Sequence, residues 1–202
     1  MIGFYDYTVI LTYIGLLSTM LGIFQAVEGN YLFSIVCMGI TLLCDTMDGR
    51  VARAKKNRTD KERLFGIQID SLCDVISFGV APSVLCYMLG LRGWLGCVAI
   101  GFYSLCCVIR LGYYNVLETN RAPDEKCVYH GLPVVGLATA MPAVYLVRSW
   151  LPEPASPWLL GGVMMVVGTL YILDFELKKP GVRQLIILLL VYLVPFVAIC
   201  LL

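Results

Sequence analysis

The sequence predicts an all-α, polytopic membrane protein that forms a single domain over residues 1–202. Of its residues, 59% are hydrophobic and only 14% are charged, about half of the ~25% charged fraction that is usual in soluble domains. The apolar residues occur in repeated stretches of roughly 18 to 25, which is the length a helix needs to cross a bilayer. The net charge of +1 and its local distribution give no reason to expect a nucleic-acid partner.

Seven membrane spans are predicted along the chain. They cover residues 8–27, 32–51, 68–89, 94–117, 132–150, 158–174 and 184–202. The residues before the first span include no basic residue and no cleavage site of small residues, so we expect this span to be kept and not removed as a signal peptide. The span at 158–174 is short, which leaves open whether it crosses fully, is tilted or is partly re-entrant.

The basic residues predict how these spans are oriented. Alternate linkers, near 50–66, 118–131 and 175–183, hold or adjoin nearly all of the 15 lysines and arginines, and the other side has only Arg92 and Arg148. Cytoplasmic loops of membrane proteins carry an excess of Lys and Arg. We therefore expect the charged linkers and the amino terminus in the cytoplasm and the carboxyl terminus outside.

Four aspartates interrupt the apolar pattern where the second and third spans approach the linker at 50–66. On the first helix, two of the acids, two small residues and an arginine fall within about 140° of one face. These residues are Asp45, Asp48, Gly49, Ala52 and Arg53. On the next helix, Gly66, Asp70 and Asp74 are spaced by four and share a face. Because both helices meet the same linker, we expect all four carboxylates to converge.

Four converging carboxylates repel one another and lose hydration, and two divalent cations would balance their charge. An all-oxygen ligand set suits Mg²⁺ or Mn²⁺ better than zinc. Gly49 and Ala52 would let a bulky group approach the helix backbone, and Arg53 could pair with a phosphate. These features favour a site for a nucleotide diphosphate that is attached to a lipid.

Two other interpretations of these charges are possible. The acids could pair with the seven bases of the linker, which themselves could simply follow the orientation rule. Ion pairing, however, does not require matched spacing on two helices. A divalent-cation channel or transporter could also use intramembrane acids, but transport sites usually lie at the midplane, and these acids cluster toward one end of their spans.

The two half-motifs resemble the signature of the CDP-alcohol phosphotransferases, also called phosphatidyltransferases. The pattern D-x-x-D-G-x-x-A-R covers residues 45–53, and G-x-x-x-D-x-x-x-D covers residues 66–74. The resemblance implies a six-helix membrane core, usually homodimeric, with its active site facing the cytoplasm of the cell inner membrane. The seventh predicted span would then be a C-terminal addition to this core.

The same resemblance implies roles for the motif residues. The metals would be held by Asp45, Asp48, Asp70 and Asp74, and Asp74 would also act as the base. The CDP moiety would be held by Asp48, Gly49, Ala52, Arg53 and Gly66. A hydroxyl that this family often places before the second glycine falls at Arg63, with Thr59 as the nearest substitute.

Three further stretches resemble phosphatidylserine synthases within this family. They are DSLCDVISFGVAP (70–82), RLGYYN (110–115) and YHGLP (129–133). The resemblance implies transfer of a phosphatidyl group from CDP-diacylglycerol to L-serine, which gives phosphatidylserine and CMP. One departure is that Gly112 and Tyr113 stand where a small residue and a second arginine are usual.

The serine carboxylate requires a cation in the protein. Arg110, Asn115 and Arg121 are the candidates for binding serine, with Lys126 and His130 as weaker ones. Arg110 could instead be a helix-end residue that reaches toward the interface. Glycerol 3-phosphate or an inositol compound are alternative acceptors, although a phosphorylated acceptor would need more bases than this sequence provides near Tyr113.

Overall fold

The computed structural model describes Gly3 and residues 7–55, 59–120, 129–177 and 182–201. Its helices are η1 (Tyr7–Val9), α1 (Ile10–Val27), α2 (Tyr31–Ala54), α3 (Asp60–Asp74), the π-helical turn η2 (Val75–Val80), α4 (Ala81–Met88), α5 (Gly93–Asn120), α6 (Gly136–Trp150), η3 (Glu153–Ala155), α7 (Ser156–Ile172) and α8 (Val182–Leu201). Over the described residues the strands are limited to β1 (Tyr129–His130) and β2 (Glu176–Leu177), which pair antiparallel. The prediction of an all-α protein is confirmed.

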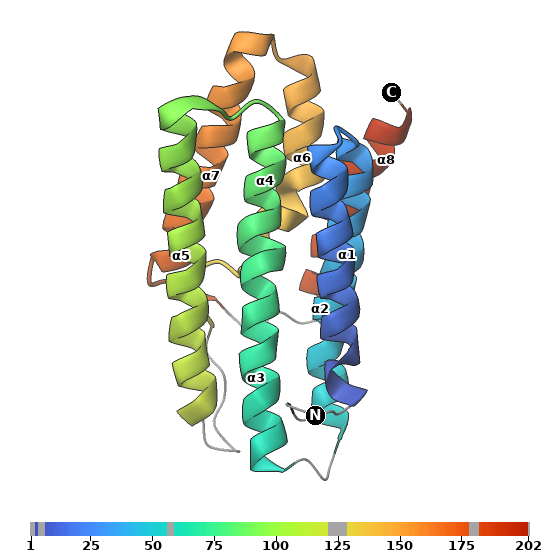
Figure 1. The fold of residues 1–202 in the computed structure, drawn as a ribbon, viewed down its shortest axis with the longest axis vertical. Coiled ribbons are helices and arrows are strands. Elements are labelled where there is room, and N and C mark those ends of the chain that lie inside the picture. The colour runs from blue at the N-terminus through green and yellow to red at the C-terminus, as the bar shows by residue number, and fades with distance from the viewer. Residues whose placement is uncertain (1–2, 4–6, 56–58, 121–128, 178–181, 202) are drawn as a thin grey trace.

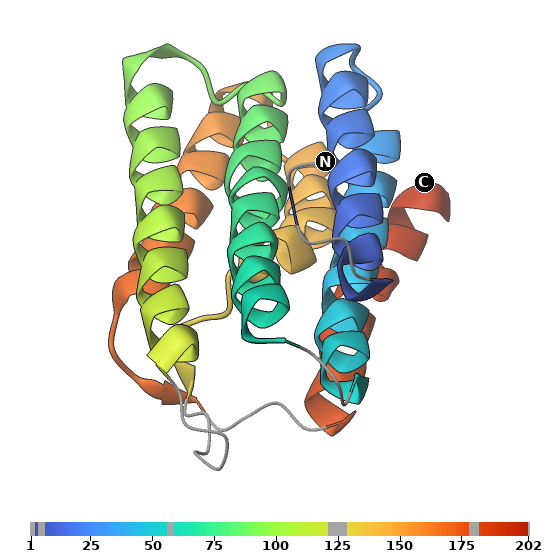
Figure 2. The ribbon, with the colours of Figure 1, turned by 60° about the horizontal axis from the view of Figure 1, so that its bottom comes forward.

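Over the described residues the helices form seven rods, each of which overlaps one predicted span. The rod of α3, η2 and α4 is continuous, because the residues at its two junctions, Val75 (φ −56°, ψ −44°) and Ala81 (φ −60°, ψ −47°), keep helical dihedral angles. Figures 1 and 2 show this rod between α5 and α1 in one layer, with α7, α6 and α8 behind it and α2 beside α1. The rods run alternately up and down, so the ends of α2 and α5 lie at the same end of the bundle as the start of α3 (Figure 1).

Five helical segments of the described chain are long and apolar enough to cross a membrane. They are Tyr7–Val27, Tyr31–Val51, Asp60–Met88, Gly93–Thr119 and Glu153–Ile172, and the shorter Ile187–Leu201 is also apolar. The segment around 158–174 therefore has the length of a full span. The short rod is α6, whose 15 residues extend about 22 Å. Its interior residues Leu137, Ala138 and Met141 are fully buried, which agrees with its place among the other helices.

The third rod begins earlier than predicted, at Asp60 and not at residue 68. The reason is a capping box: the Thr59 hydroxyl accepts a hydrogen bond from the backbone N–H of Glu62, and the Glu62 carboxylate accepts one from the backbone N–H of Thr59 at 2.8 Å. Such reciprocal caps satisfy two of the donors left open at a helix start. The linker expected over 50–66 is thus limited to residues 55–59. The charged residues on either side of it lie on the end of α2 and the start of α3.

The core places η2 firmly against α5, which in turn packs against α7. Phe78 of η2 and Tyr103 of α5 are almost completely buried, and the Tyr103 hydroxyl donates to the Phe78 carbonyl at 2.5 Å. The ring centroids of Tyr103 and Tyr171 lie 5.6 Å apart, and the Tyr171 hydroxyl donates to the Val134 carbonyl at 2.6 Å. Buried hydroxyls that find partners in this way stabilise a single packing arrangement.

Candidate active site

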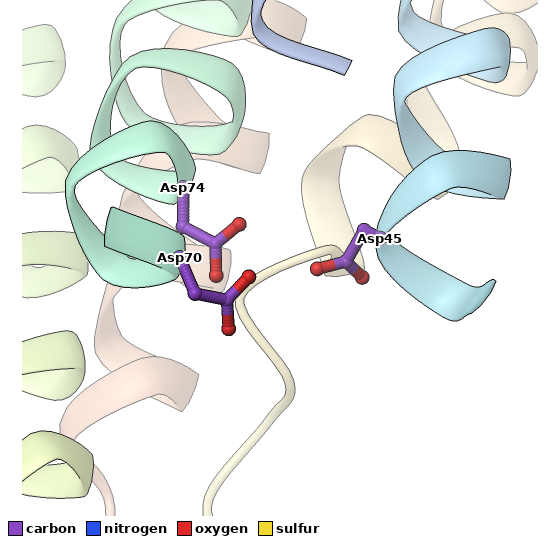
Figure 3. Close-up of side chains that lie close together, drawn as sticks. All are labelled: Asp45, Asp70 and Asp74. Atoms are coloured by element: carbon purple, nitrogen blue, oxygen red, sulfur yellow. The ribbon is translucent and has the colours of Figure 1, made fainter. Parts of the chain in front are cut away.

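Three carboxylates from two helices meet inside the bundle. Asp45 comes from α2, and Asp70 and Asp74 come from α3, one helical turn apart. One oxygen of each lies within 4.8 Å of the others. Figure 3 shows Asp70 and Asp74 pointing from their helix toward Asp45. The predicted convergence of the two half-motifs is confirmed for these three residues.

Asp48 lies beside this group, one turn after Asp45 on α2. Its side chain is buried, and its Oδ2 accepts a hydrogen bond of 3.0 Å from the Thr12 hydroxyl of α1. The Asp70 carboxyl is in hydrogen-bonding contact with Asp48. All four aspartates of the motif therefore adjoin one another, and a third helix orients one of them.

The residues present fit a divalent cation. The Oδ1 atom of Asp70 is buried and has no hydrogen-bond partner, and a buried carboxylate oxygen without a partner is costly. The group Asp45, Asp70 and Asp74 offers only carboxylate oxygens, the donors that suit Mg²⁺ and Mn²⁺. A bound cation would remove both the repulsion among the carboxylates and the cost of the unpaired oxygen.

The backbone changes its winding directly behind the carboxylates. The π-helical turn η2 starts at Val75, the residue after Asp74, and such turns occur frequently at functional sites. Ser77 of this turn hydrogen-bonds with Thr19 at 2.8 Å, and Thr19 with Thr41 at 3.0 Å. A small cavity that adjoins Asp45, Asp48 and Asp74 is lined by Thr12, Thr41 and Ser77 as well. The interior behind the site is therefore polar.

Arg110 of α5 is a buried cation that interacts with this carboxylate group. Its side chain is only 7% exposed, so it is not a helix-end residue that reaches toward the interface. Its Cζ atom lies 4.4 Å from the centre of the Tyr114 ring, and its charge acts on the Asp74 carboxylate. The predicted serine-binding arginine thus lies near the predicted base.

Asn115 has a structural contact that the sequence did not reveal. Its Oδ1 accepts a 2.5 Å hydrogen bond from the Ser71 hydroxyl. Ser71 lies between Asp70 and Asp74 on α3, so this bond fixes the carboxylate-bearing helix to α5. The predicted serine ligand Asn115 therefore has an orienting contact with the site.

Gly49 and Gly66 lie on α2 and α3, partly buried, next to the aspartates of their motifs. The side chains of Ala52 and Arg53, and residues Arg121 and Lys126 as a whole, lie outside what the structure describes.

Three residues of the linkers have defined partners. The Thr59 hydroxyl is engaged in the α3 cap. A terminal nitrogen of Arg63 donates to the Glu118 carbonyl at 3.1 Å, which ties the start of α3 to the end of α5. The His130 Nδ1 atom lies 2.6 Å from Asp174 Oδ1.

Sequence reasoning missed Thr12, Ser71 and Tyr114 as parts of this site. Ser71 lies inside the second half-motif, and Tyr114 lies four residues after Arg110, the spacing at which helical side chains meet. These two could have been found from their positions. Thr12 is an isolated hydroxyl in an apolar span and gives no comparable signal.

Comparison with known proteins agrees with this geometry. A family model described as CDP-alcohol phosphatidyltransferase matches residues 8–174. The chain belongs to the CDP-alcohol phosphatidyltransferase family. The match covers the six rods up to α7 and ends before α8, so α8 lies outside the matched region.

Several curated proteins of this transferase family are similar to the chain. The CDP-diacylglycerol–serine O-phosphatidyltransferase of Saccharomyces cerevisiae is 33% identical over 112 residues, which cover 53% of this chain and 39% of the relative. The protein of the same name from Helicobacter pylori is 37% identical over 123 residues, covering 59% and 48%. The archaetidylserine synthase of Methanothermobacter thermautotrophicus is 32% identical over 163 residues, covering 80% and 65%. The chain spans about half the length of most of these relatives, and no solved structure matches it.

Proposed function

We propose that this chain transfers a phosphatidyl group from CDP-diacylglycerol to L-serine and releases CMP. The observation that carries the proposal is the meeting of Asp45, Asp70 and Asp74 between α2 and α3, in a chain whose family transfers such groups. The serine part is supported by relatives named for serine as acceptor, whether their lipid is diacylglycerol-based or archaeal. The shared feature of these relatives is the headgroup and not the lipid backbone.

The four motif aspartates would hold two divalent ions, Mg²⁺ or Mn²⁺. When bound, these ions would supply Lewis-acid stabilisation of charge on the attacked phosphate and on the leaving CMP. Two neighbouring helices hold the ligands in place, because Thr12 of α1 orients Asp48 and Asn115 of α5 holds Ser71 beside Asp70 and Asp74. The nucleotide would lie along Asp48, Gly49, Ala52, Arg53 and Gly66.

Asp74 would accept the proton of the serine hydroxyl. As this proton leaves, the serine oxygen forms a bond to the phosphorus that carries the lipid, and the bond from that phosphorus to the oxygen of CMP breaks. Arg110 would bind the serine carboxylate through its guanidinium. Its electrostatic interaction with Asp74 supports this assignment, since one small amino acid must reach both groups.

The position of the site relative to the membrane is part of the proposal. The site would face the cytoplasm of the inner membrane, because the basic linkers next to it are expected on that side. The protein would act as a homodimer, as the family resemblance implies, and Arg121 would be a further residue for binding serine.

A panel of acceptors tests the proposal with the purified protein. CMP release from CDP-diacylglycerol is measured with L-serine, glycerol 3-phosphate or myo-inositol, each with Mg²⁺, with Mn²⁺ and with EDTA. We expect release with L-serine and a divalent ion and none in EDTA. CMP release with glycerol 3-phosphate or inositol but not with serine would show that L-serine is not the acceptor. Divalent-ion flux into liposomes without CDP-lipid, and no CMP release, would favour a channel instead.

A further inference from the structure

The YHGLP segment is held by the chain that follows α7. β1 pairs with β2, with His130 opposite Glu176, and the Gly131 N–H donates to the Phe175 carbonyl at 2.9 Å. The His130 ring also contacts Asp174 at 2.6 Å. We call residues 129–131 and 174–177 together the clasp.

The glycine of the clasp is required by its surroundings. Gly131 has φ +68°, and a Cβ atom there would lie 3.0–3.2 Å from the carbonyl oxygens of Leu173, Tyr171 and Leu170. Both the backbone angle and the tight contacts disfavour a larger residue. The fixed position of Gly131 therefore also holds the backbone of the preceding residue, His130, at a defined place.

Tyr114 joins this clasp to Arg110. Its hydroxyl donates to the His130 carbonyl at 2.6 Å and accepts from the His130 backbone N–H at 2.5 Å. Its ring lies under the Arg110 guanidinium, with 4.4 Å between Cζ and the ring centre. One tyrosine thus contacts a fixed backbone with its polar end and the candidate serine ligand with its face.

We propose that Tyr114 is a positioning residue that presents Arg110 to the carboxylate of the acceptor. This inference rests on the proposed function, in which Arg110 binds that carboxylate. Stacking uses the face of a guanidinium, while its N–H donors point outward in the plane and keep the geometry that matches a carboxylate. A long arginine side chain otherwise loses rotamer freedom when it binds, and holding it beforehand lowers that cost.

The arrangement predicts a selective defect. Loss of the tyrosine should weaken the binding of serine and leave the binding of the CDP-lipid unchanged, because the nucleotide is assigned to α2 and α3. A purely structural role would instead lower the melting temperature and change the kinetic constants for both substrates together.

The test uses the full chain with Tyr114→Leu, Tyr114→Phe and the matched control Tyr87→Leu. Tyr87 of α4 also has an arginine over its ring, with 5.5 Å between the Arg92 Cζ atom and the ring centre, but it is 42% exposed and lies at the other end of the bundle. KM for L-serine, KM for CDP-diacylglycerol, kcat and Tm are measured for each. We expect Tyr114→Leu to raise KM for serine about three- to thirtyfold, with KM for CDP-diacylglycerol within about twofold. Tyr114→Phe, which keeps the ring, should show a rise of only about two- to fivefold, and Tyr87→Leu should match the wild type.

Failure of the inference and failure of the proposed function give different results. If the wild type releases no CMP with L-serine, the function itself is wrong and the inference falls with it. If the wild type is active and Tyr114→Leu leaves KM for serine unchanged, or shifts both KM values equally, the inference alone is wrong. Should the leucine variant not fold, an unchanged KM for serine in Tyr114→Phe contradicts the inference in the same way.

Discussion

The two ends of the helix bundle carry different residues on similar apolar rods. Toward the end where α2 stops and α3 starts lie the carboxylate group, Arg110 and the clasp. The opposite end carries Trp94, Trp150 and Trp158, at the start of α5, the end of α6 and the start of α7, each between 71% and 75% exposed. Tryptophans at helix ends are typical of the membrane–water interface.

This contrast shows where the fold keeps unfavourable interactions. At the carboxylate end, like charges lie within 4.8 Å of one another, and an Asp70 oxygen is buried without a partner. Around the tryptophans, no such group occurs among the described residues apart from the buried Ser156 hydroxyl. Natural proteins keep a cluster of such unfavourable arrangements mainly at functional sites. The substitutions below test whether function is confined to the carboxylate end.

Removing the charge of Asp74 should have the largest effect. We expect Asp74→Asn to lower CMP release by about a thousandfold or more, since it removes both a metal ligand and the proton acceptor. Binding of CMP, measured by calorimetry with Mn²⁺, should remain detectable. The matched control is Asp60→Asn, an exposed aspartate in the first turn of the same helix, which should retain activity. Near-normal turnover in Asp74→Asn would contradict the assigned base.

Neutralising Asp70 should show whether this residue stabilises the fold or binds metal. In EDTA, Asp70→Asn should raise Tm by about 2–4 °C for each kcal/mol of repulsion relieved, because one of the converging charges is gone. The stabilisation that Mn²⁺ gives the wild type should shrink or vanish. A lower Tm in EDTA, together with a full response to Mn²⁺, would show that Asp70 stabilises the fold and does not bind metal.

Removing the Thr12 hydroxyl should have a moderate effect on metal affinity. Thr12→Val keeps the shape of the side chain but removes the 3.0 Å hydrogen bond to Asp48. Groups that orient metal ligands typically contribute ten- to a hundredfold to affinity, so we expect Mn²⁺ to bind about tenfold more weakly by electron paramagnetic resonance. Thr12→Ser should restore binding. Equal affinity in the valine and serine variants would exclude this role.

The features of the fold that sequence could predict are those set by local pattern. The length of the apolar stretches predicted the number of rods. The spacing of the aspartates by three and four residues predicted that Asp45 would face Asp70 and Asp74. The start of α3 was missed because a cap, and not hydrophobicity, defines it: Thr59 and Glu62 begin the helix eight residues before the apolar run was expected.

The contacts that sequence could not predict join distant segments. The clasp brings His130 to Asp174, 44 residues along the chain, and Asn115 accepts from Ser71 across a separation of 44 as well. Nothing in the local periodicity specifies such pairings, since they depend on how the rods pack. Asn115 and His130 were considered for binding serine, and their contacts indicate that both also help to hold other parts of the site in place.

A substitution at the opposite end should have the smallest effect on catalysis. Trp158 is 72% exposed at the start of α7, so Trp158→Leu leaves no cavity and should keep kcat and both KM values within about twofold. In liposomes, tryptophan emission of the wild type should be quenched more by lipids brominated near the headgroup than by lipids brominated deep in the chains, and Trp158→Leu should lose part of that quenching, because an indole ring favours the interface. A loss of activity above about tenfold would show that the two ends are energetically coupled. In that case function would not be confined to the carboxylate end, and the α7 rod, which also contacts the clasp through Leu170 and Tyr171, would be the connection to examine.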